Sequence, residues 1–153
     1  MMTGMRKRGA LAAAVLLACA GHAPASAQPV DRDALERMLA GESQIQGPEL
    51  ERRIAVAAAH PLGSMENPVR AAMPRGQRAY LQRLRCADGA APTFGRIGNF
   101  GAGVYGNIID GYRVRCAGGT PAETVVYMDM YHRGHVEERP VPGFTIQPSG
   151  PTA

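Results

Sequence analysis

The sequence predicts a single α+β domain, with two short N-terminal helices packed on a small antiparallel sheet and one intrachain disulfide. Three observations lead to this prediction. Helical spacing of apolar residues is confined to residues 31–59, alternating or β-branched segments follow residue 77, and two cysteines end two of those segments. A chain of 153 residues is long enough for one domain with a hydrophobic core. Its content of 45% apolar and 20% charged residues excludes a disordered, highly charged chain.

The N-terminus has the three parts of a secretory signal peptide. Three cations at positions 6–8 precede an apolar run over residues 10–18, which is shorter than the roughly 20 residues of a membrane-spanning helix. Ala25 and Ala27 then supply the small residues of a cleavage site. We therefore expect residues 1–27 to be removed and a periplasmic or secreted protein to begin at Gln28.

A second interpretation of this segment stays open. Residues 16–19, Leu-Leu-Ala-Cys, resemble a bacterial lipobox, in which Cys19 would be acylated and would anchor a lipoprotein. Cleavage after Ala27 is favoured because Leu17 is an unusual residue for the middle of a lipobox. We expect no transmembrane segment after cleavage, because no later segment is long and apolar enough.

The positive charge of the chain belongs mostly to this signal peptide. The chain has 17 Lys and Arg against 13 Asp and Glu, which gives a formal charge of +4. Residues 1–27 contain three of these cations and no acid, so a chain that begins at Gln28 keeps 14 cations against 13 acids. Binding to nucleic acid depends on Lys and Arg that neutralise phosphates, so we expect no nucleic-acid partner.

Two helices are expected at the start of the mature chain. Residues 31–40 carry Asp33 and Glu36 at capping-box spacing and end before Gly41, a residue suited to the position after a helix. The second helix begins near Pro48 and ends before Pro61. Residues 61–76 contain too many prolines and glycines for a long element, and we expect a connection that wraps the core.

Three strands are expected next, over residues 77–86, 108–116 and 123–132. The first two end in alternating sequences followed by turn residues, and the third is rich in β-branched and aromatic residues. Their short connections favour an antiparallel sheet. A helical interpretation of residues 77–86 stays open. Beyond the domain of residues 28–146, we expect a disordered tail over residues 147–153.

The two cysteine segments resemble each other, because residues 83–86 read Arg-Leu-Arg-Cys and residues 113–116 read Arg-Val-Arg-Cys. Two such strands side by side would place Cys86 and Cys116 within disulfide distance in an oxidising compartment. The alternative is two separate buried thiols. The period of two in a strand would also place the four arginines together on the opposite face. These anion-binding candidates are Arg83, Arg85, Arg113 and Arg115.

Guanidinium groups suit carboxylate, phosphate and sulfate ligands, so an anionic envelope component or small molecule is the expected partner. The alternative is a solvated face whose charge is balanced by acidic residues. A glycine-rich loop over residues 95–106 would extend this surface. Residues 101–106 match G-x-G-x-x-G, but no helix is expected after them, so we expect no dinucleotide or other cofactor.

Residues 128–135 concentrate side chains that bind soft metal ions. Thioethers and imidazoles suit copper, and Asp129 and Glu137 beside the histidines would form a loose zinc set without a recognised spacing. The candidate metal ligands are Met128, Met130, His132 and His135. The alternative is that the methionines face the core and the histidines lie on the surface.

Little in the sequence favours catalysis. The serines of the mature chain have no nucleophile motif, the cysteines are expected to be oxidised, and nothing places Asp110 beside His132 as an acid–base pair. We therefore expect an exported, non-catalytic binding or envelope-associated domain. A periplasmic copper- or zinc-binding protein is the alternative.

Overall fold

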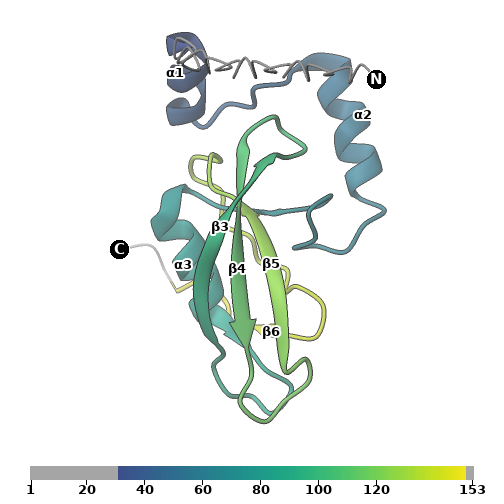
Figure 1. Cartoon of the computed structure of the whole chain (residues 1–153), viewed down its shortest axis with the longest axis vertical. Coiled ribbons are helices and arrows are strands. Elements are labelled where there is room, and N and C mark those ends of the chain that lie inside the picture. Colours follow the sequence, from purple (N-terminus) through teal and green to yellow (C-terminus); the bar gives the residue numbers. More distant parts are fainter. Residues whose placement is uncertain (1–30, 151–153) are drawn as a thin grey trace, which may run out of the picture.

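The computed structural model describes residues 31–150, and the expected signal peptide and Cys19 lie outside these residues (Figure 1). The helices are α1 (Arg32–Ala40), α2 (Gly47–Ala57) and α3 (Met73–Arg83). The strands are β1 (Val69–Arg70), β2 (Leu84–Arg85), β3 (Thr93–Ala102), β4 (Ile108–Arg115), β5 (Glu123–Asp129) and β6 (Thr145–Ile146). None of the described helices combines the length and the apolar character needed to cross a membrane.

The α+β class is confirmed, and the main sheet is mixed rather than purely antiparallel. Its strand order is β1-β5-β4-β3, in which β3, β4 and β5 pair antiparallel and the two-residue β1 joins β5 in parallel. The register places Val69 opposite Met128 and Arg70 opposite Asp129. A second, two-stranded sheet pairs β2 with β6.

The strand expected over residues 77–86 is wrong, because most of this segment forms α3. Pro74 suits the first turn of a helix, and Gln77, Tyr80 and Leu81 repeat at helical spacing and are buried. Strand alternation would have placed Tyr80 on the face opposite Gln77 and Leu81, whereas the helix buries all three side chains. Only Leu84 and Arg85 are extended, and they pair with β6 rather than with β4.

The hydrophobic core lies between α3 and the face of the sheet that it covers. Leu81 and Leu84 pack there with Val114, Val126 and Met128, and all five side chains are fully buried. Figure 1 shows α3 beside the sheet, whereas α1 and α2 lie at the end where β3 turns into β4. No residue of α1 is buried, and α2 buries only Ala57. The expected packing of the two N-terminal helices on the sheet is therefore not confirmed.

The disulfide between Cys86 and Cys116 is confirmed, with Cα atoms 5.9 Å apart. The geometry expected for it is only partly correct. Cys116 follows β4 as expected, but Cys86 follows β2, a strand of the other sheet. The bridge therefore joins the two sheets, and both cysteines belong to the core.

The glycine-rich segment is a ten-residue edge strand for most of its length, so the expected loop over residues 95–106 is wrong. Strand pairing uses backbone hydrogen bonds, so the glycines of β3 do not prevent it from pairing with β4. The register of the two strands shifts between Arg96 and Gly98 and again between Asn99 and Ala102. Gly111 of β4 permits the close approach of Phe100, because a Cβ atom there would lie 2.4 Å from the Phe100 ring. Only residues 103–107 connect the two strands.

Candidate functional site

The four predicted arginines form two separate pairs. Arg83, on α3, donates to the Glu138 carboxylate at 2.6 Å and to the backbone carbonyls of Glu137 and Gln147. Arg85, on β2, donates to the side-chain oxygen of Gln147. These bonds hold the chain just beyond β6, a segment that the sequence predicts to be part of a disordered tail.

Arg113 and Arg115 are the second pair, and they project from the same face of β4. The Glu123 carboxylate lies 3.3 Å from the Nε atom of Arg113 and 2.6 Å from that of Arg115. Because Glu123 is also the register partner of Arg115 on β5, a paired strand holds this three-residue arrangement. The structure does not bring the second pair onto a common face with Arg83 and Arg85, because β2 is not a neighbour of β4.

A third arginine, which sequence reasoning missed, joins the second pair. Arg96 of β3 lines a surface hollow of about 330 Å³ together with Arg113 and Arg115, and we call this site the arginine hollow. Gly95 lies opposite Arg113 in the register, and a Cβ atom at Gly95 would meet nothing within 4 Å. The missing side chain thus leaves open space beside Arg113, whereas Arg96 lies opposite Tyr112 in the register and its side chain projects from the other face of the sheet.

Ion pairs fix these arginines without using all of their donors. Arg96 Nη2 binds Asp110 Oδ1 at 2.6 Å, and this hydrogen bond and the aspartate charge raise the pKa of Arg96. Gln77 holds the other oxygen of Asp110 at 3.1 Å from the α3 side. Among the described residues, the terminal nitrogens of Arg113 and Arg115 make no hydrogen bond, so these donors are available to a ligand.

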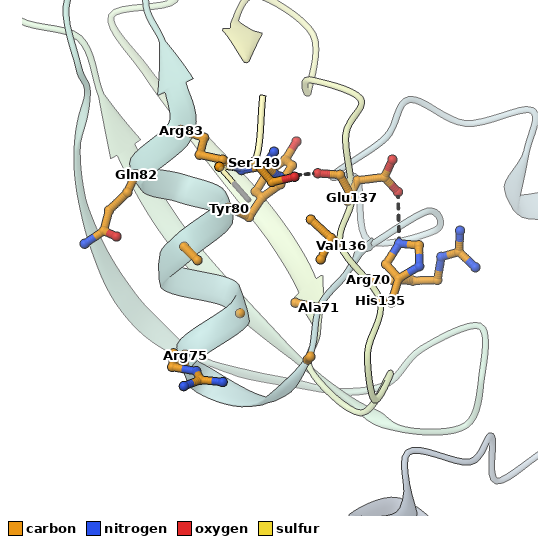
Figure 2. A pocket seen from close by; sticks show the side chains of 14 residues that line it. Arg70, Ala71, Arg75, Tyr80, Gln82, Arg83, His135, Val136, Glu137 and Ser149 are labelled. Carbon is orange, nitrogen blue, oxygen red and sulfur yellow. Dashed lines mark hydrogen bonds and ion pairs between the residues drawn. The ribbon is translucent and has the colours of Figure 1, made fainter. Parts of the chain in front are cut away.

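A larger pocket of about 470 Å³ lies between α3 and residues 135–137 (Figure 2). Its walls combine small apolar residues, among them Ala71, Ala79 and Val136, with polar and charged ones. Arg83 lies at its edge, but its guanidinium group is already occupied by Glu138 and two backbone carbonyls. On the α3 side of this pocket, Arg75 is the arginine that makes no ion pair among the described residues.

The predicted histidines lie close together at the end of β5. His132 Nε2 lies 3.1 Å from the fully buried carboxylate of Asp129, and the His132 ring stands edge-on to Tyr105 at 4.5 Å. The ring centre of His135 is 6.4 Å from that of His132, and its Nε2 atom is 3.6 Å from Glu137. Burial lowers the pKa of His135, and the charge of Arg70 acts in the same direction.

The predicted methionines have different surroundings from the histidines. Met128 is buried in the core, and Met130 lines another depression beside Pro74 and Arg78. Within residues 31–150, no three His, Cys, Asp or Glu side chains are grouped so that they could hold a metal ion.

Two other sequence patterns now have a structural context. Asp110 binds Arg96 and Gln77, whereas His132 lies against Asp129, so Asp110 and His132 have different partners. The G-x-G-x-x-G match at residues 101–106 is followed by β4 instead of a helix, so it lacks the helix N-terminus that binds a pyrophosphate. Comparisons of the chain with protein-family models, curated proteins and solved structures gave no match in any of the three.

Proposed function

We propose that the chain is an exported, non-catalytic binding domain that holds a phosphate or sulfate ester group in the arginine hollow. The observation that carries this proposal is that Arg113 and Arg115 lie side by side at one open space and keep unused donors there. The ester belongs to an anionic envelope component or to a small molecule. Removal of residues 1–27 delivers the domain to the periplasm or the exterior, with Cys19 acylation as the alternative route.

The charge of the hollow and its unused donors suit a phosphate or sulfate ester group. The guanidinium groups of Arg113 and Arg115 lie on the face of β4 that lines the hollow, and the Glu123 carboxylate bound to both leaves a local excess of one positive charge. Because only the Nε atoms of the two arginines contact Glu123, their terminal nitrogens can donate to different oxygens of one ester group. Arginine forms strong, charge-assisted hydrogen bonds with such groups.

Binding of glucose 6-phosphate, with glucose as the uncharged reference, tests this proposal by calorimetry on the mature protein. We expect saturable binding of the phosphate ester only. Arg113→Gln and Arg115→Gln should each weaken it by about tenfold or more, because a hydrogen bond to a charged group contributes roughly 1.5–3 kcal/mol. Arg85→Gln is the matched control, because it removes the same charge outside the hollow.

Gly95→Val separates the hollow from general attraction between charges. Gly95 has an ordinary backbone conformation and open space around its missing side chain, so valine should fit the strand and fill the hollow without changing any charge. Affinity should fall as far as in the arginine variants. Equal losses in Arg85→Gln and Arg113→Gln, or full binding by Gly95→Val, would overturn the proposal.

A further inference from the structure

Arg70 is a half-buried arginine without an acidic partner among the described residues. It ends β1, where the neighbouring Val69 side chain enters the core and directs Arg70 to the other face. Figure 2 shows Arg70 beside His135, across the pocket from α3. Burying part of an arginine without an acid costs free energy unless another group satisfies its donors.

Two carboxylates whose charges act on the neighbouring Tyr105, those of Asp129 and Glu137, are already bound by other residues. Asp129, the register partner of Arg70, accepts hydrogen bonds from Asn107 at 3.2 Å and from the backbone of Tyr131 at 3.0 Å. Glu137 is held by two nitrogens of Arg139, at 2.9 and 3.1 Å. Arg70 therefore keeps its positive charge available for a ligand.

Arg70 lines a second cavity, of about 220 Å³, between α2 and the connection from β3 to β4. Tyr105, Asn67 and Arg139 are the other polar residues of its wall, and Ala58 and Leu62 are among the apolar ones. Pockets for drug-sized molecules have volumes of about 300–1,000 Å³, so this cavity suits a smaller ligand. We call it the Arg70 cavity.

We propose that the Arg70 cavity binds a small free oxyanion, of the size of inorganic phosphate or sulfate. The guanidinium group of Arg70 supplies the charge and a fork of donors. The hydroxyl group of Tyr105 supplies a further donor, and burial raises the pKa of Tyr105, so this proton remains in place at neutral pH. The site is separate from the arginine hollow, which is wider and lies on β3 and β4.

The test is a titration of mature protein carrying Arg113→Gln with inorganic phosphate, and separately with sulfate, at constant ionic strength. The Arg113→Gln background weakens the arginine hollow, so failure of one site is not mistaken for failure of the other. Resonances of the Tyr105 ring, followed by nuclear magnetic resonance, should shift and reach saturation. Addition of Arg70→Gln should weaken this response at least tenfold, and Arg70→Lys should keep part of it, because lysine retains the charge without the fork.

Ala58→Leu provides an independent variant, because it fills the cavity and leaves every charge in place. Ala58 is exposed at the end of α2, so the larger side chain should be compatible with folding, and Ala59→Leu is the control at an exposed residue outside the cavity wall. We expect Ala58→Leu to abolish saturation and Ala59→Leu to preserve it. Unchanged titrations in Arg70→Gln, or in a folded Ala58→Leu protein, would overturn the assignment.

Discussion

Glu137 shows how a single charged residue is stabilised at low exposure. Its side chain is only 5% exposed. Burial acts to raise the pKa of Glu137, but hydrogen bonds and charge from Arg139 outweigh this effect and lower the pKa to about 2. The folded protein therefore keeps this carboxylate ionised at pH values where the unfolded chain protonates it. Its contribution to stability is complete above pH 4.5 and is lost as the pH falls towards 2.

Glu137→Gln should lower the free energy of unfolding by about 1–3 kcal/mol at pH 7, because Arg139 loses its charged partner. The difference from wild type should shrink as the pH is lowered from 4.5 towards 2. Urea denaturation at a series of pH values measures both effects. Glu36→Gln, at an exposed position of α1, is the control. A difference that is the same at pH 3 and pH 7 would show that the carboxylate charge is not responsible.

At the scale of single residues, the sequence predicted which kinds of residue would form the disulfide and the candidate site. It was less successful in predicting which residues these side chains contact. The cysteine pair was predictable, because only two cysteines remain after residue 27. The association of Arg113 with Arg115 followed from the strand period of two. Arg96 was missed because its glycine-rich surroundings indicated a loop, and the nearby β-branched and aromatic residues Thr93, Phe94 and Ile97 were the signal that could have identified a strand. The role of Arg70 depends on contacts across the chain that no local pattern reveals.

At the scale of elements, α3 makes the contacts that the sequence assigned to the first two helices. Leu81 of α3 is fully buried, whereas Leu39 of α1 is 51% exposed. The propensity of residues 77–86 was ambiguous, and the tertiary contacts of Gln77, Tyr80 and Leu81 with the sheet decided in favour of a helix. Gln77 accepts a hydrogen bond from Tyr112 at 3.0 Å and donates one to Asp110, so polar contacts also fix α3 on β4.

Leu81→Ala should therefore lower the free energy of unfolding by about 2–5 kcal/mol, the usual range for a leucine removed from a core. Leu39→Ala should change it by less than about 0.5 kcal/mol, as for most surface substitutions. Thermal and urea unfolding of the two variants make the comparison. Equal losses of stability would contradict the assignment of the core to α3.

The disulfide joins elements that are 30 residues apart in the sequence. Closing a loop of this length should stabilise the folded state by about 3–4 kcal/mol, mainly by restricting the unfolded chain. We expect a reducing agent to lower the melting temperature of the wild type. The double variant Cys86→Ala/Cys116→Ala should have a lower melting temperature than the wild type, and the reductant should not change it.

A thiol assay on unfolded, unreduced mature protein should find no free thiol. Two free thiols per chain would contradict the disulfide.

At the scale of the whole molecule, most of the excess positive charge and the proposed ligand site lie in different parts of the chain. Residues 1–27, the proposed signal peptide, carry three of the four excess positive charges, so the arginine hollow is a local feature of a nearly balanced remainder rather than part of a generally basic surface. The spacing of apolar and β-branched residues was sufficient to predict the α+β class. It could not predict the parallel strand β1 or the position of α1 and α2, because these depend on contacts between distant segments.

The proposed export can be tested by the intact mass of the protein recovered from a bacterial host. A chain that begins at Gln28 and carries no lipid is expected, because Ala25 and Ala27 supply the small residues that leader peptidase accepts at a cleavage site. Mass spectrometry of the periplasmic and membrane fractions measures this directly. A mass that corresponds to acylated Cys19 would support the lipoprotein alternative, and an uncleaved chain would contradict export by either route.

The most direct test of the central claim is a residue-resolved titration of the mature protein with glucose 6-phosphate, followed by nuclear magnetic resonance of backbone amides and arginine side chains. The arginine hollow predicts saturable shifts concentrated at Gly95, Arg96, Arg113 and Arg115, with no such response to glucose. A response of equal size at Arg75, Arg78 and Arg85, or no response within the hollow, would contradict the claim.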